Sequence, residues 1–113
     1  MKELDKVRIG NFVVLGEQDG PFERVLKEEL VSFCRRDKGV VRAYLARANS
    51  DRDVGVEVVL GLRTHFGPDP RLAERIGKIF ASIFSDTEHL DIIFLTEEQE
   101  VRVAAACRPF FVE

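Results

Sequence analysis

The sequence contains few of the residues that metal centres and nucleophilic active sites use. It has two cysteines and two histidines among 113 residues. Neither His65 nor His89 has a histidine, a cysteine or a pair of carboxylates beside it at metal-ligand spacing. The Gly16–Gly20 segment carries two acids and lacks the Lys-Ser/Thr ending of a phosphate-binding loop. We therefore predict no catalytic residue, no metal site and no cofactor.

A long apolar run and an excess of positive charge are also missing. No apolar run approaches the ~20 residues that cross a bilayer, and the first residues lack the apolar region of a secretory signal. The net charge is −3, and lysines and arginines alternate with acids, which argues against a nucleic-acid partner. We expect a cytoplasmic protein with neither a membrane nor a nucleic acid as partner.

The composition that is present is typical of one globular unit. Hydrophobic residues make up 45% of the chain and charged residues 33%, which suits a packed interior and a solvated exterior. We predict a single domain over residues 1–113.

Local patterns predict alternating strands and helices. The expected elements, in chain order, are a strand over Val7–Leu15 that a bulge or turn at Gly10-Asn11 could break, a helix from Pro21 that stops at Gly39, a hairpin of Val40–Arg47 and Val54–Leu62, a helix from Asp69-Pro70 to about Phe84, a strand over Leu90–Leu95, and a helix from Thr96 to about Cys107 followed by the apolar tail Phe110–Val112.

This order predicts an α+β fold. With right-handed crossovers and helices on one face of an antiparallel sheet, it gives a ferredoxin-like (split βαβ) α/β sandwich, β-α-β-β-α-β, plus a C-terminal helix and the tail. The same elements in a different strand order are the structural alternative.

The hairpin strands alternate between two faces. One set of side chains is expected to pack on the helices: Val41, Ala43, Leu45, Val54, Val56, Val58, Leu60 and Leu62. The other set is expected on an open face, where Gly55 and Gly61 leave room for a partner to approach. The binding residues predicted on that face are Arg42, Tyr44, Glu57 and Arg63.

The last strand is apolar on both faces and therefore needs two covers. Either the third helix and the Phe110-Phe111 tail fold across its second face, or a second copy or partner protein covers it. On the latter view the interface residues are Ile93, Leu95, Phe110 and Phe111.

The two thiols differ in their setting. Cys34 falls on the apolar stripe of the first helix and is more typical of a core thiol than of a nucleophile. Cys107 is more ambiguous. A thiol or hydrolytic enzyme acting through Cys107 or His65 is a third hypothesis, for which no base or orienting partner is evident.

Three strands and the chain end resemble the C-terminal domain of the enhanced-serine-sensitivity (SseB) family. The segments that carry the likeness are Val41–Ala46, Val56–Leu62, Leu90–Ile92 and Pro109-Phe110-Phe111, with the helix opening at Pro21 ahead of them. Phe111 stands where the family pattern has tyrosine. The resemblance implies a bacterial cytoplasmic protein linked by name to serine sensitivity, with no catalytic residues to carry over.

Two hypotheses about function follow. The first is a non-enzymatic interaction or regulatory domain that binds a protein partner or a second copy as a homodimer. The second is a small-molecule domain that senses an amino acid, by analogy with regulatory domains of ferredoxin-like architecture. Its ligand would meet backbone groups at Gly16–Gly20 and a strand edge in a dimer.

Overall fold

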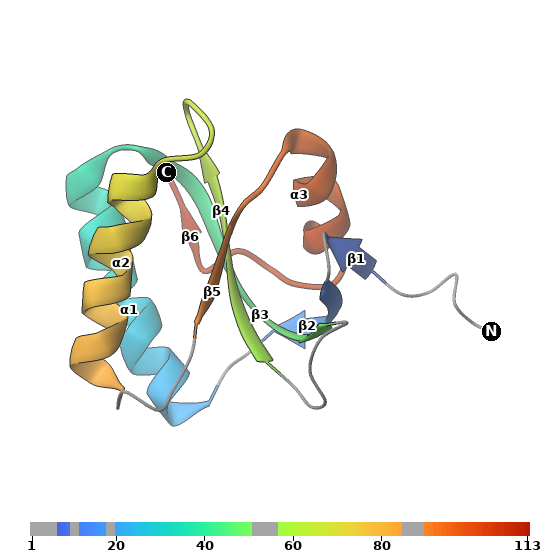
Figure 1. Cartoon of the computed structure of the whole chain (residues 1–113), viewed down its shortest axis with the longest axis horizontal. Helices are drawn as coiled ribbons and strands as arrows, with labels where there is room; N and C mark the ends of the chain where they lie inside the picture. Colours follow the sequence, from blue (N-terminus) through green and yellow to red (C-terminus); the bar gives the residue numbers. More distant parts are fainter. Residues whose placement is uncertain (1–6, 10–11, 18–19, 51–56, 85–89) are drawn as a thin grey trace.

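The computed structural model describes residues 7–9, 12–17, 20–50, 57–84 and 90–113. Within them the chain forms a mixed sheet and three helices, so the α+β class is confirmed (Figure 1). The elements are β1 (Val7–Ile9), β2 (Phe12–Glu17), α1 (Pro21–Asp37), β3 (Val40–Ser50), β4 (Glu57–Thr64), α2 (Pro70–Ile83), β5 (Asp91–Phe94), α3 (Glu97–Ala104) and β6 (Phe111–Val112).

The strand order differs from the ferredoxin-like prediction. The strands lie in chain order, β1-β2-β3-β4-β5, and β6 pairs with β3. Each pair is antiparallel except β4 and β5, which are parallel. In a ferredoxin-like sheet, the strand before α1 lies between the two strands that correspond to β4 and β5 of this protein. Instead β2 pairs with β3, so α1 joins antiparallel neighbours and makes no crossover.

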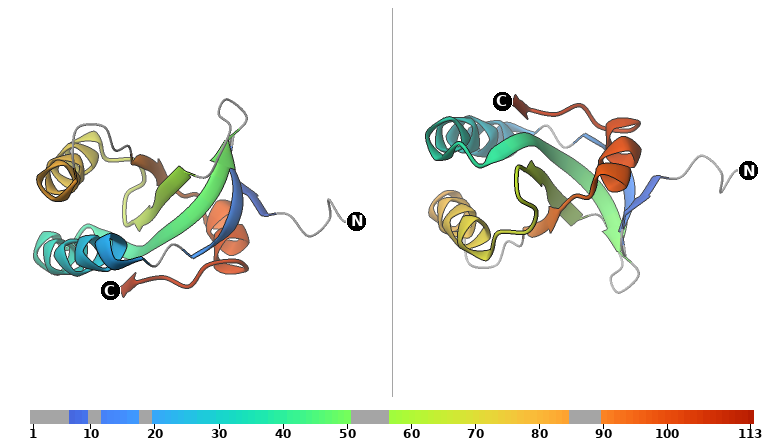
Figure 2. Two further views of the ribbon diagram at one scale, coloured as in Figure 1. Left: turned by 90° about the horizontal axis from the view of Figure 1, so that it is seen from below. Right: turned by 90° about the horizontal axis from the view of Figure 1, so that it is seen from above.

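Helices cover both faces of the sheet. One apolar core joins α1 and α2 to the sheet through residues such as Leu45, Leu60 and Ile76, each at most 1% exposed. A second core lies on the opposite face, where Val103 of α3 and Cys107, which follows the helix, join Tyr44 and Val59. Figure 2 shows this arrangement, with α1 and α2 on one side and α3 on the other. The predicted alternation is confirmed for Ala43, Leu45, Val58, Leu60 and Leu62. It is wrong at Val41, because the register shifts between Val40 and Arg42 and Val40 takes the core position instead. Neither face of the sheet is bare.

The helix boundaries follow their predicted capping residues closely. Pro21 opens α1, and Asp69 accepts a hydrogen bond from the N–H of Leu72 at the start of α2. Thr96 and Gln99 form the predicted capping box of α3. One detail differs: the left-handed residue that ends α1 is Lys38 (φ 66°), one position before the predicted Gly39.

The chain end returns to the sheet as a strand. Phe111 of β6 pairs with Ala43 of β3 and is buried in the core beneath α1 and α2, and Phe110 packs partly against the same core. The prediction that this tail crosses the second face is therefore wrong. The third helix does cover the second face of the sheet, as predicted. Glu100 and Val103 of α3, and Cys107 after it, lie at helical spacing and are buried against this face.

Candidate functional site

Three of the four predicted binding residues converge on one carboxylate of α3. Arg42 donates from Nε and Nη2 to Glu100, the second bond being 2.9 Å long. The Tyr44 hydroxyl donates to Glu100 Oε2 at 2.7 Å, and Arg63 Nε lies 3.1 Å from Oε1. Arg63 also donates from Nη1 to the carbonyl oxygen of Leu95 at 3.2 Å. We call Arg42, Tyr44, Arg63 and Glu100 the arginine–carboxylate cluster.

The cluster closes the face that the sequence predicted to be open. Tyr44 is 3% exposed and Glu100 7% exposed. Arg42 and Arg63 keep about a third and a quarter of their side chains in solvent. The residues do share one face, as predicted, but α3 lies over it. The fourth residue, Glu57, pairs through its backbone with Ala48, and its side chain lies outside the described part of the structure.

Electrostatics in the cluster fix the charge of each member. Hydrogen bonds from Arg42, then from Tyr44, hold the pKa of Glu100 below its ordinary value, against the opposing effect of burial. Burial and the bond to Glu100 raise the pKa of Tyr44 to about 12. The hydrogen bond to Glu100 raises the pKa of Arg42 further. Two cations thus share one anion beside a neutral phenol, so the carboxylate is fully engaged and the arrangement ties α3 to the sheet.

Sequence reasoning missed Glu100 because it lies in the first turn of α3 beside other acids. There a carboxylate is accounted for by the helix dipole alone. The available signal was spacing: Glu100, Val103 and Cys107 recur at i, i+3 and i+7, which places the acid on the buried stripe.

The four predicted interface residues are all covered, wholly or partly, by the chain itself. Leu95 is 5% and Phe111 8% exposed. Ile93 packs partly against the core under α3, and Phe110 partly against the core under α1 and α2. Ile93 belongs to β5, at one edge of the sheet, whose four residues are only half-buried, and Phe111 belongs to β6, which pairs with β3 off the main strand path.

The thiols and histidines form no catalytic arrangement in the described residues. Both cysteines are free and buried, which confirms the core position predicted for Cys34. His65 lies at the surface with Nε2 2.9 Å from both carboxylate oxygens of Glu113. No group of three or more potential metal ligands occurs in the part of the chain that the structure covers. His89 and the middle of the Gly16–Gly20 segment lie outside it, so an amino-acid site at that segment stays a prediction.

Burial should make both thiols slow to react. Burial, and then a nearby acid, raises the pKa of Cys34 and of Cys107 to about 11. At pH 8 the thiolate fraction is about 100-fold lower than for a thiol of pKa 9. A more basic thiolate is a better nucleophile, but this raises the reaction rate by only about tenfold, so the net rate still falls about tenfold. We expect reaction with an aromatic disulfide reagent to be at least about tenfold slower in the native protein than in urea. Two fast-reacting thiols in the native state would contradict this.

An exposed apolar surface lies between α1 and α2. The predicted buried stripe of α1 is buried only from Leu26 onward, because Phe22 and Val25 are 65% and 46% exposed. On α2 the predicted ridge is fully buried only at Leu72 and Ile76. The half-buried and exposed members form what we call the helix strip: Phe22, Val25, Ile79, Phe80, Ile83 and Phe84.

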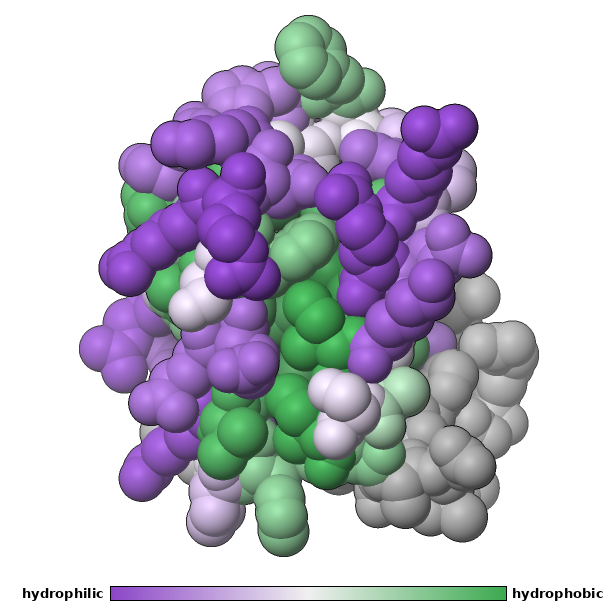
Figure 3. Space-filling view, turned by 90° about the vertical axis from the view of Figure 1, so that its left-hand side faces the viewer, coloured by the Kyte–Doolittle hydropathy of each residue, from purple (hydrophilic) through white to green (hydrophobic). Residues whose placement is uncertain are grey.

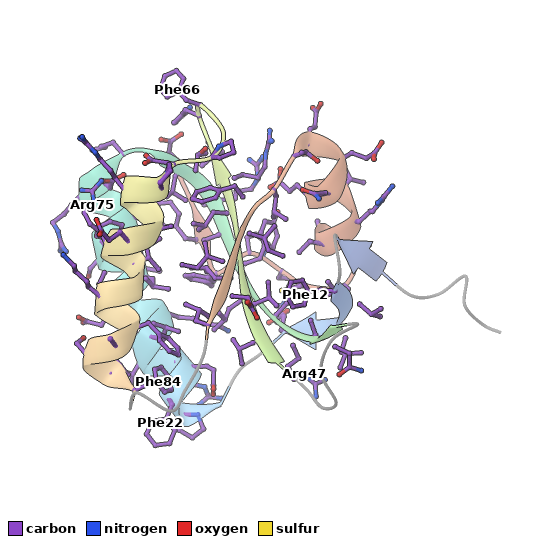
Figure 4. All side chains as sticks on the ribbon, in the orientation of Figure 1. Phe12, Phe22, Arg47, Phe66, Arg75 and Phe84 are labelled. Carbon is purple, nitrogen blue, oxygen red and sulfur yellow. The ribbon has the colours of Figure 1, made fainter. Side chains whose placement is uncertain are left out.

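The helix strip is continuous and bordered by charge. Phe80 and Phe84 stack at 4.6 Å between ring centroids, and Phe22 lies 6.0 Å from Phe84. Figure 4 shows Phe22 and Phe84 together at one end of the two helices. In the space-filling view of this side, apolar atoms run between the helices with hydrophilic side chains on both borders (Figure 3). Apolar strips with polar rims mark binding surfaces in soluble proteins.

Comparison with known protein families identifies the family of this chain. The family model of the SseB protein C-terminal domain matches residues 8–113. The chain belongs to the SseB C-terminal domain family. This confirms the resemblance seen in the β3, β4 and β5 segments. No match was found among curated proteins or among solved structures. None of the helices described for this SseB C-terminal domain has the length and apolar character needed to cross a bilayer.

Proposed function

We propose that this SseB C-terminal domain is a non-enzymatic protein-interaction domain of the bacterial cytoplasm. Its binding surface is the helix strip, and its partner presents an amphipathic helix that lies along the groove between α1 and α2. The exposure of Phe22 and Val25 beside the aromatic stack is the observation that carries this proposal.

Geometry supports a helix as the bound element. The two helices run antiparallel, since the start of α1 meets the end of α2 at Phe22 and Phe84, while Asp37 at the end of α1 bonds Arg75 early in α2 at 3.0 Å. A pair of packed helices presents a groove that accepts a third helix through residues spaced i, i+3, i+4 and i+7.

The charges on the two borders set the partner's chemistry. On α1 the exposed Glu28 and Glu29 follow Val25 by one turn, with the exposed Arg36 farther along the same side, whereas α2 exposes Arg71, Arg75 and Lys78. A complementary helix carries an apolar row with basic residues on the flank toward α1 and acidic residues on the flank toward α2. Such complementarity gives orientation and partner choice.

Other features agree with recognition without catalysis. Glu100, the one buried acid among the described residues, is bound by Arg42 and Tyr44. The buried thiols have raised pKa values, and free thiols are typical of a reducing compartment.

The test compares two polar variants at exposed positions. The double variant Phe22→Ser/Val25→Ser removes apolar side chains from the helix strip without touching buried residues. Phe66→Ser is the matched control, because Phe66 is 98% exposed and lies away from the helix strip, at the other end of the helix pair in Figure 4. Proteins captured from a bacterial lysate by the wild type are purified, and their affinities for all three forms are measured by calorimetry.

We expect the double variant to weaken binding at least about 30-fold, because two anchor residues at more than about 1 kcal/mol each are lost. Phe66→Ser should bind like the wild type. Amide NMR shifts with the purified partner should map to α1 and α2. A partner that binds the double variant as tightly as the wild type would contradict the proposal.

A further inference from the structure

We propose that two copies of this chain associate through the free edge of β5 and extend the sheet across a twofold axis. The strand is the last in the order β1-β2-β3-β4-β5, and among the described strands it pairs only with β4. In Figure 1, β5 lies in front of β4 and α2 in front of α1, and both views of Figure 2 place β5 and α2 on that same side.

Backbone geometry shows which groups point outward from this edge. The N–H of Leu95 donates to the carbonyl of Leu62 in β4 at 2.8 Å. In a parallel pair, alternate residues direct both N–H and C=O to the same neighbour. Asp91, Ile93 and Leu95 therefore bond toward β4, while Ile92 and Phe94 direct a donor and an acceptor each away from it. No backbone partner of these four groups occurs among the described residues.

Several of the features that keep edge strands apart are absent here, although the strand is only four residues long and begins with the charged Asp91. The segment Asp91–Phe94 contains no proline and no lysine, and its pairing with β4 has no bulge. Its three apolar side chains are only half-buried in the single chain. Natural proteins protect an unused edge with such devices, and an apolar edge without them pairs with another strand.

The outward groups of Ile92 and Phe94 define one antiparallel register that a second copy can satisfy. In an antiparallel pair, residues that exchange both bonds stand opposite one another. Pairing Ile92 with Phe94 of the second copy, and Phe94 with its Ile92, satisfies all outward groups of the two residues with one twofold axis. Ile93 then lies beside the twofold axis, opposite Ile93 of the second copy. The interface is isologous and closes at two subunits.

A second feature, on α2, fits the same axis. Arg75 contacts Asp37 and Phe33 of α1, so its flank of α2 faces α1. The small residues Ala73, Gly77 and Ala81 lie on the opposite flank, since residues two positions apart differ by about 200° around a helix, and Phe80, seven residues after Ala73, lies on that flank too. A Cβ built at Gly77 meets no atom within 4 Å. A twofold axis perpendicular to the sheet brings the two α2 helices together on one side, and small residues allow close approach.

This dimer presents both helix strips on the same side of the extended sheet. A partner with two helices would bind it with avidity. The inference does not rest on the proposed function, because the sheet extension uses the backbone of Ile92 and Phe94, although Phe80 of the helix strip lies on the α2 flank that would face the second copy.

Cysteine cross-linking tests the register directly. In Ile93→Cys the two new thiols stand opposite one another in a pair whose Cα atoms are about 4.5 Å apart, within disulfide reach. In the control Ile92→Cys each new thiol faces Phe94 of the second copy instead. Both native cysteines are buried. On mild oxidation we expect Ile93→Cys to form a covalent dimer in high yield and Ile92→Cys to remain largely uncross-linked.

Analytical ultracentrifugation tests the surface in the same protein. Ile92→Pro removes an outward N–H and no bond to β4, so we expect a folded chain with Kd raised at least about tenfold, two hydrogen bonds being lost per dimer. Gly77→Lys should also weaken association, whereas Phe22→Ser/Val25→Ser should dimerise normally. A monomer at several hundred micromolar, equal cross-linking of the two cysteine variants, or a dimer unaffected by both Ile92→Pro and Gly77→Lys would overturn the inference. A strand peptide from another protein that binds monomers at β5 would do so too.

Discussion

Replacing Glu100 by glutamine is expected to lower the free energy of unfolding by about 2–4 kcal/mol at pH 7. The carboxylate accepts bonds from Arg42 and Tyr44 and lies beside Arg63, and it is 7% exposed. Glutamine keeps the shape but removes the anion, and its amide group cannot accept from all three donors. Two partly buried guanidinium groups would then face each other without a counter-charge.

The matched control is Glu98→Gln on the same helix. Glu98 has a side chain 79% exposed and pairs with Arg102 at i, i+4, so its loss should cost at most about 0.5 kcal/mol. Urea unfolding of the two variants and the wild type, followed by circular dichroism, measures the difference. Equal stabilities for both variants would show that the cluster does not hold α3 on the sheet.

Acid should remove the advantage that Glu100 confers. Its pKa in the folded protein lies below the ordinary value of 4.5, chiefly because of the hydrogen bonds from Arg42. A depressed folded pKa stabilises the folded state fully above the unfolded pKa, and this contribution is lost as pH falls through the folded pKa. The stability gap between wild type and Glu100→Gln should therefore be constant near neutrality and shrink below about pH 4.5. A gap that persists unchanged at pH 2 would refute this assignment.

The sequence predicted those features that depend on neighbouring residues. Alternation along Arg42, Ala43, Tyr44 and Leu45 assigned each side chain to the correct face, and Asp69 and Thr96 marked the starts of α2 and α3. These signals arise within one strand or one turn of helix, where spacing alone determines direction.

Strand order and cover depend on contacts between distant segments, and there the predictions failed. Nothing local distinguishes β2 pairing with β3 from β2 pairing with β4 and β5, because either order buries the same faces. An acid such as Glu100 is explained equally well by the helix dipole or by a buried bond to Arg42, 58 positions away. Only the fold decides between them.

The helix strip shows a third kind of difference between the sequence prediction and the structure. Periodicity identified Phe22 and Val25 as part of the apolar side of α1, which is correct, but it does not say how far along the helix the core extends. Since α2 ends beside Phe22, the apolar side continues past the point where the chain can cover it. The residues that the sequence assigned to the core thus include Phe22 and Val25, which the structure leaves exposed.

Gly61 gives the second large effect, and it shows what occupies the space that the glycine leaves. Gly61 is buried in β4, opposite Tyr44 in β3 and Ile93 in β5. A Cβ at this position would come 3.0 Å from Leu95 Cδ1. The room expected for a partner on this face is filled by Leu95, which is 5% exposed and whose carbonyl is bound by Arg63.

We expect Gly61→Val to lower the free energy of unfolding by about 2–3 kcal/mol, since overpacking outweighs the higher strand propensity of valine, which is worth at most about 1 kcal/mol. Leu95→Ala alone should cost about 2–4 kcal/mol through the cavity that it leaves. Because valine at 61 would extend into that cavity, the double variant should be more stable than the sum of the single effects predicts, by at least about 1 kcal/mol. Strictly additive effects in a denaturant double-mutant cycle would mean that the two side chains do not compete for one space. The second face of the sheet would then have spare volume beside Tyr44, and Leu95 would no longer account for the glycine.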